Sequence, residues 1–112
     1  GADHAKIGQH DTAGIGMAAA RWLVEQKGAM MIASDTSGLE VLPPRPADSQ
    51  FVGGSFNPVH VYLLVNQGVH IGEFHNMERL AADRVYEFAY VATTNAIRGT
   101  VAGTALRPLA LR

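Results

Sequence analysis

The sequence predicts a mixed α/β fold, and three observations carry that prediction. Apolar residues recur at helical spacing in two segments, near residues 12–27 and 59–66, which is typical of helices that bury one face. Short apolar or alternating runs follow each of these segments, as expected of strands. Apolar residues make up 47% and charged residues 17% of the 112-residue chain, a composition typical of globular proteins. We therefore expect residues 1–112 to form a single domain.

The first expected helix follows residues 1–11, which we interpret as an N-terminal arm or the remnant of a tag. Asp11 or Thr12 is the candidate cap, and Gly28 is the candidate end because glycine adopts the left-handed conformation at little cost. The spacing predicts an inward apolar stripe made of Ile15, Ala18, Ala19, Trp22, Leu23 and Gln26.

Residues 29–34 form a continuous apolar run, which predicts a strand buried on both faces. A turn at 35–38 and a short extended piece at 39–41 are expected next. Residues 43–57 are rich in proline and glycine, so we expect an irregular surface loop. Pro58 suits the first turn of a second helix that runs to about Asn66 and ends at Gly68. Its expected inward residues are Val59, Tyr62 and Leu63.

The remaining segments predict further strands at 69–74, 85–91 and 106–111, with a short helix at 77–83. Pro108 places the last strand at a sheet edge or a bulge. These strands are few for a closed sheet, so we expect missing chain or another subunit to complete it. Because unpaired strand edges invite pairing, the predicted partner is a second copy of the chain or a complementary N-terminal chain.

Composition argues against several classes of partner. The formal net charge is -1 without a basic stripe, which gives no electrostatic support for nucleic-acid binding. We see no apolar run of membrane-spanning length and no signal-peptide pattern, so we expect no membrane partner and a cytoplasmic location. The chain has no cysteine, so any metal would be bound through nitrogen and oxygen.

The densest polar cluster comprises His60, His70, Glu73 and His75. In an extended segment, Glu73 and His75 would share one face and His70 would point to the other. His60 begins the helix that leads into this segment, so it can return to the same place. Two imidazoles and one carboxylate are a common zinc set. Isolated histidines are more often surface or satisfied core groups, and that interpretation stays open.

Four other residues are weaker candidates. Asp35 follows a buried strand, a common place for active-site residues, although aspartate is equally common in turns. For Glu40, a functional role and a purely structural one likewise both stay open. For His4 and His10, which lie in the N-terminal arm, solvent exposure or a tag is the default interpretation.

Several segments taken together resemble the cyclase family of metal-dependent hydrolases, which includes bacterial kynurenine formamidase and isatin hydrolase. The central match has the family's Pro-Val-His, Leu-Leu and Gly-Val elements followed by a glutamate, within Pro58–Val65, Gly68–Glu73 and Asn76–Leu80. The flanking matches are Ala13–Ile15, Trp22–Leu23, Ala33–Thr36 with Glu40, Tyr86–Phe88, Gly99 and Gly103–Ala110. The resemblance covers nearly the whole chain from about residue 12.

This resemblance implies part of a swivelling β/β/α fold, a dimer or tetramer, and hydrolysis of a small amide such as an aryl formamide or a cyclic amide. It implies a divalent metal, zinc or manganese, that polarises the carbonyl and activates water, and no organic cofactor. By position, Glu73 would be a metal ligand. His60 would be a ligand of a second metal or a nearby catalytic acid or base.

The chain also departs from the family pattern. The main metal motif, His-x-Gly-Thr-His-x-Asp-x-Pro-x-His, is absent from these 112 residues, so the chain is expected to supply only part of a metal site and to be inactive alone. Ala13 and Ala105 replace family prolines, Thr104 replaces a serine, and His75 is not a usual family position.

Three hypotheses follow. In the first, the chain belongs to an active hydrolase whose other half lies on another segment or chain. In the second, it is a short non-catalytic scaffold that oligomerises or binds a small ligand. In the third, His60, Glu73 and His75 build a new metal site across a subunit interface.

Overall fold

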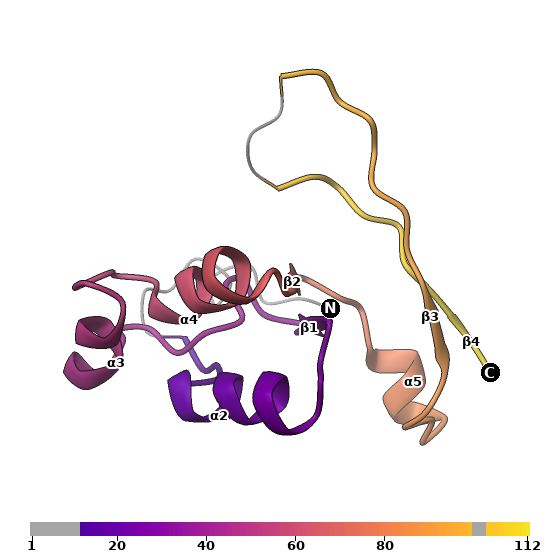
Figure 1. Ribbon diagram of the computed structural model, residues 1–112. Helices are drawn as coiled ribbons and strands as arrows, with labels where there is room; N and C mark the ends of the chain where they lie inside the picture. Colours follow the sequence, from indigo (N-terminus) through magenta and orange to yellow (C-terminus); the bar gives the residue numbers. More distant parts are fainter. Residues whose placement is uncertain (1–11, 100–102) are drawn as a thin grey trace. The chain divides into compact units, whose positions relative to one another are not determined.

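The computed structural model describes residues 12–99 and 103–112, which combine helices with short strands (Figure 1). The mixed α/β prediction is confirmed at this level. The chain divides into two compact units, the first ending at Asn76 and the second running from Met77 to Arg112. The predicted arm at 1–11, with His4, His10 and the candidate cap Asp11, lies outside the described residues. Within the described ranges, no helix has the length and apolar character needed to cross a membrane.

The first predicted helix is present as α2, Met17–Arg21, continued by the π-helical η1, Trp22–Gln26. The predicted cap Thr12 is wrong, since it pairs with Leu42 in a β-bridge while Gly16 is the N-cap. The predicted stripe is also wrong, because the helix begins later and buries Met17 and Ala20. Trp22 is instead 53% exposed. The predicted end is confirmed, with Gly28 at a φ of 66°.

Strands β1, Met31–Ala33, and β2, His70–Gly72, form a parallel pair with Met31 opposite His70. Burial of β1 on both faces was predicted wrongly. Its residues are half-buried or exposed, because β1 pairs with β2 alone in the part of the chain that the structure describes. Pairing continues past the strand ends, where the amide of Ser34 donates to the carbonyl of Gly72 at 3.0 Å.

The segment predicted as an irregular loop contains a helix, α3, Pro46–Phe51. Pro46 occupies the first turn, where the missing proline N–H breaks no helical hydrogen bond. Asp48 of this helix accepts a hydrogen bond from the first amide of α2, with 3.5 Å between Met17 N and Asp48 Oδ2. The helix thus takes part in the packing of the first unit.

The second predicted helix is confirmed as α4, Pro58–His60, continued by the π-helical η2, Val61–Gln67. Gly68 ends it at a φ of 66°. The predicted inward residues are all buried, and they form the core of the first unit with residues from α2 and two loops. This core comprises Met17, Ala20, Leu39, Val59, Tyr62, Leu63 and Val69. It fixes the start of α4, which carries His60.

The second unit consists of α5, Glu78–Ala82, and an antiparallel ribbon of β3, Ala89–Val91, and β4, Leu109–Leu111. These strands are shorter than predicted, and all six of their residues are exposed. Pro108 directly precedes β4, and in a two-stranded ribbon both strands are edge strands. Asp83, just after α5, accepts hydrogen bonds from Arg79 at 2.9 Å and from Arg112 at 2.6 Å.

Candidate functional site

The site is built where α4 begins, against the segment that carries Glu40. Backbone hydrogen bonds to Ile15 hold that segment in place. The Ile15 amide donates to the carbonyl of Leu39 at 3.0 Å. The Ile15 carbonyl accepts from the amide of Val41 at 3.1 Å. Gly14 lies so close that a Cβ atom built there would fall 2.5 Å from the carbonyl oxygen of Glu40. A residue without a side chain is therefore needed at this position.

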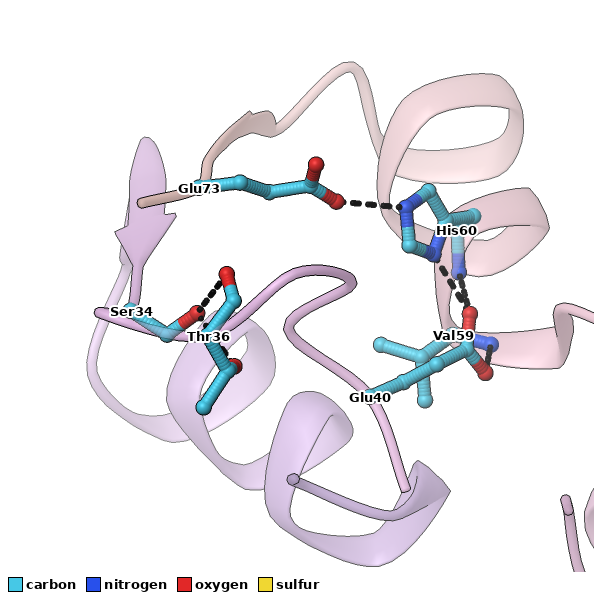
Figure 2. Close-up of polar contacts among 6 residues, drawn as sticks. All are labelled: Ser34, Thr36, Glu40, Val59, His60 and Glu73. Carbon is cyan, nitrogen blue, oxygen red and sulfur yellow. Dashed lines mark hydrogen bonds and ion pairs between the residues drawn. The ribbon is translucent and has the colours of Figure 1, made fainter. Parts of the chain in front are cut away.

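Glu40 is 1% exposed, and its two carboxylate oxygens accept three hydrogen bonds (Figure 2). Oε2 accepts from the amide of Val59 at 3.0 Å. Oε1 accepts from the amide of His60 at 3.1 Å and from His60 Nδ1 at 2.5 Å. The first amides of a helix lack partners within the helix, and Asn57, the N-cap, makes no side-chain capping bond. Glu40 supplies the missing acceptors from a distant part of the chain.

Glu73 lies on the other side of the His60 ring. Its Oε1 atom is 3.4 Å from His60 Nε2, and Figure 2 shows the imidazole between the two carboxylates. The side chains of His60 and Glu73 are 25% and 34% exposed. The ring therefore has a buried contact through Nδ1 and a solvent-accessible contact through Nε2.

The segment of Glu73 is tied to the loop after β1. The amide of Phe74 donates to the carbonyl of Thr36 at 3.2 Å, and the amide of His75 donates to that of Ser34 at 3.0 Å. The hydroxyl oxygens of Ser34 and Thr36 lie 3.0 Å apart (Figure 2). These contacts hold the residues directly after Glu73 against the loop that contains Ser34 and Thr36.

The carboxylates alter the acid–base behaviour of His60. The hydrogen bond to Glu40 raises the pKa of the His60 imidazole, burial opposes that rise, and the charges of Glu40 and Glu73 add to it. The two carboxylates thus favour the protonated form of the His60 ring more strongly than water alone would.

Unfavourable backbone conformations flank both carboxylates. Leu39, next to Glu40, and Phe74, next to Glu73, each have a φ of 55°. A non-glycine residue in this region costs on the order of 1–3 kcal/mol, and such residues cluster at functional sites. The positions of the two carboxylates are thus held by the surrounding structure against local preference.

The hydrogen bond between His60 and Glu73 does not include the other predicted residues. His75 directs its Nδ1 atom to the backbone oxygen of Glu73 at 3.2 Å, and its ring lies against Gly72. The strand alternation behind the predicted shared face ends at Gly72, because Phe74 is left-handed. Asp35 is exposed in the turn after β1, and His70 is exposed on β2.

The contact between Glu40 and His60 was not predicted, although Glu40 was an open candidate. The two residues are 20 positions apart, and no local spacing links them. The available signal was the sequence Asn57-Pro58, a helix start that here lacks a capping side chain. Such a start needs an acceptor from elsewhere.

Comparison of the sequence with models of protein families gives no match, and comparisons with curated proteins and with solved structures give none either. The resemblance to the cyclase family therefore stays a prediction that rests on the quoted residues.

Proposed function

We propose that this chain contributes two ligands, His60 and Glu73, to the divalent-metal site of an enzyme that hydrolyses a small amide. The observation that carries the proposal is the 3.4 Å separation between His60 Nε2 and Glu73 Oε1. Both groups are partly open to solvent. The substrate class, an aryl formamide or a cyclic amide, and the swivelling β/β/α architecture come from the cyclase resemblance.

The donor set fits a zinc or manganese ion. Imidazole nitrogen and carboxylate oxygen both bind these metals, and His60 Nδ1 is already occupied by Glu40, which leaves Nε2 for the ion. A bound ion would supply Lewis-acid chemistry at the substrate carbonyl. His60 would serve as a ligand or, in a one-metal site, as the acid or base beside it. Catalytic zinc sites typically use three protein ligands, so the others must come from another segment or chain.

The second unit supports a partner. All six residues of the β3–β4 ribbon are exposed, and a two-stranded ribbon is marginally stable alone in water. Strand edges of this kind pair readily with another chain. We propose a homo-oligomer or a complementary N-terminal chain as that partner.

Zinc titration of the full chain and of its oligomer or complemented complex, followed by calorimetry, tests the proposed ligands. We expect His60→Gln and Glu73→Gln each to weaken zinc affinity by at least about tenfold, the scale seen when a metal's surroundings are altered. His70→Gln is the matched control, because His70 is an exposed histidine on β2. Equal affinities for all three variants and the unaltered chain would refute the ligand assignment. His75→Ala should leave affinity unchanged, whereas a loss would support the interface site of His60, Glu73 and His75.

A non-catalytic scaffold is the second candidate function. It is compatible with one observation: within residues 12–99 and 103–112, no group of three or more His, Asp or Glu side chains is placed to hold a metal ion. An assay of aryl formamide hydrolysis separates the hydrolase from the scaffold. The assay is run with zinc or manganese on the chain and on its oligomer or complemented complex. Metal-dependent turnover supports the hydrolase, and metal binding without turnover in the complemented complex supports the scaffold.

A further inference from the structure

The buried carboxylate of Glu40 does more than cap a helix. A buried carboxylate is costly unless it is hydrogen-bonded, and the amides of Val59 and His60 are two donors that the start of α4 leaves free. Those two bonds account for capping. The third bond, from His60 Nδ1, is not needed for it and points to a role toward the imidazole.

We propose that Glu40 is a positioning residue that holds the neutral form of the His60 ring with its proton on Nδ1, so that Nε2 faces Glu73 and solvent. Carboxylate oxygens act as acceptors, so the Nδ1 atom at 2.5 Å is the donor. The same oxygen also accepts from the backbone amide of His60. Rotation of the ring away from this orientation would break the bond to Nδ1 while the backbone stayed anchored.

The position of Glu40 is itself fixed by the N-terminal part of the first unit. Backbone bonds of Ile15 to both neighbours of Glu40, and the close approach of Gly14, hold this segment. The left-handed conformation of Leu39 directly precedes it. A residue 20 positions away in sequence thereby sets the orientation of the imidazole.

The consequence for metal binding rests on the proposed function. When a carboxylate holds one nitrogen of a histidine, the other nitrogen is presented to a metal as a pre-oriented and more basic ligand, and loss of the carboxylate typically costs 10–100-fold in metal affinity. Glu40 would thus act on the metal through His60 without touching it.

The test is nitrogen NMR of the histidine rings in the full, metal-free chain at alkaline pH, where neutral imidazoles report their tautomer. The His60 signals are assigned by their loss in His60→Gln. We expect the unaltered protein to show the Nδ1–H form of His60. We expect Glu40→Met to lose that preference, because methionine has the length of glutamate without its oxygens. Glu73→Gln, which changes the neighbour of Nε2, is the matched control and should keep the Nδ1–H form.

Two outcomes overturn the proposal: an Nε2–H tautomer of His60 in the unaltered protein, or an unchanged tautomer in Glu40→Met. The first can be read even if Glu40→Met does not fold. A purely structural cap would lower the thermal stability of Glu40→Met without moving the tautomer. Zinc titration of Glu40→Met is expected to show a 10–100-fold loss in affinity. Failure of both the unaltered chain and its oligomer or complemented complex to bind zinc, together with an Nδ1–H tautomer, would refute the proposed function and leave the role of Glu40 standing.

Discussion

Replacement of Gly14 by alanine tests how tightly the segment of Glu40 is held. A Cβ atom at this position would clash with the carbonyl carbon of Glu40 and lie 2.5 Å from the carbonyl oxygens of Leu39 and Glu40. These are backbone atoms and cannot turn aside as a flexible side chain can. The segment must therefore move away from Ile15, which weakens the two backbone hydrogen bonds that join them.

The expected loss follows from these contacts. Overpacking costs about 1–3 kcal/mol, and two weakened hydrogen bonds add about 0.5–1.5 kcal/mol each. Gly14→Ala should therefore lower the free energy of unfolding by about 2–6 kcal/mol. With a urea dependence of about 1–3 kcal/mol per M, the midpoint of unfolding should fall by at least about 0.7 M.

Urea unfolding, followed by the fluorescence of Trp22 in the first unit, measures this loss. Gly16→Ala is the matched control, because a Cβ there meets its nearest neighbour, Asp48 Oδ2, at an ordinary 3.5 Å. Since Gly16 is the N-cap of α2, the control should cost about 1 kcal/mol or less. Equal midpoints for the two variants would refute the close packing of Gly14 against Glu40, and with it the fixed position of the carboxylate.

Three further predictions concern the core, the charge of His60 and the contact between the strands. Leu63→Ala should destabilise the first unit by about 2–5 kcal/mol, because Leu63 is 0% exposed. Leu64→Ala is the control and should cost under about 1 kcal/mol, because Leu64 is 49% exposed. Urea unfolding of the two variants measures both free energies. Because Glu40 raises the folded-state pKa of His60, the contact between the two residues should stabilise the fold fully below the unfolded-state pKa of about 6.5. This stabilisation should be lost as the pH rises through the folded-state pKa. Stability measured against pH should show this loss, and His60→Gln should remove it. Gly72→Ala should cost about 1–3 kcal/mol, because its new methyl group would lie 3.1 Å from Ala33 Cβ and closer still to two movable side-chain ends; a midpoint equal to that of the unaltered chain would contradict this.

The second helix was predictable because its signals are local and agree with one another. Pro58 fits the first helical turn, Gly68 takes the left-handed conformation at the end, and Val59, Tyr62 and Leu63 fall on one face. The first helix shows the limit of this reasoning. Its inward face depends on where the helix begins, and the start at Met17 is set by contacts with distant residues rather than by a capping side chain.

The missed helix α3 has a similar cause. Pro43, Pro44 and Pro46 suggested an irregular loop, yet Pro46 at the first helical position is compatible with a helix. What decides between these outcomes is packing: α3 contacts α4, and its Asp48 meets the amide of Met17. Such contacts are long-range and leave no local periodicity in the sequence.

In the candidate site, likewise, one contact could be predicted from local sequence signals and another could not. His60 and Glu73 are 13 residues apart, and the helix followed by a strand between them predicts that the chain returns to the same place. Their proximity could therefore be anticipated. The bond from Glu40 depends on the pairing of Ile15 with Leu39 and Val41, which joins segments with little regular structure, so the sequence left its role open.

For the proposed metal site, the geometry around His60 indicates the side from which further ligands would come. Nδ1 and the backbone amide of His60 are occupied by Glu40 on the buried side, so an ion can reach the ring through Nε2. Glu73 lies on that side, with its Oε1 atom 3.4 Å from Nε2. A segment or chain that completed the proposed site would therefore approach over Nε2, on the side of Glu73.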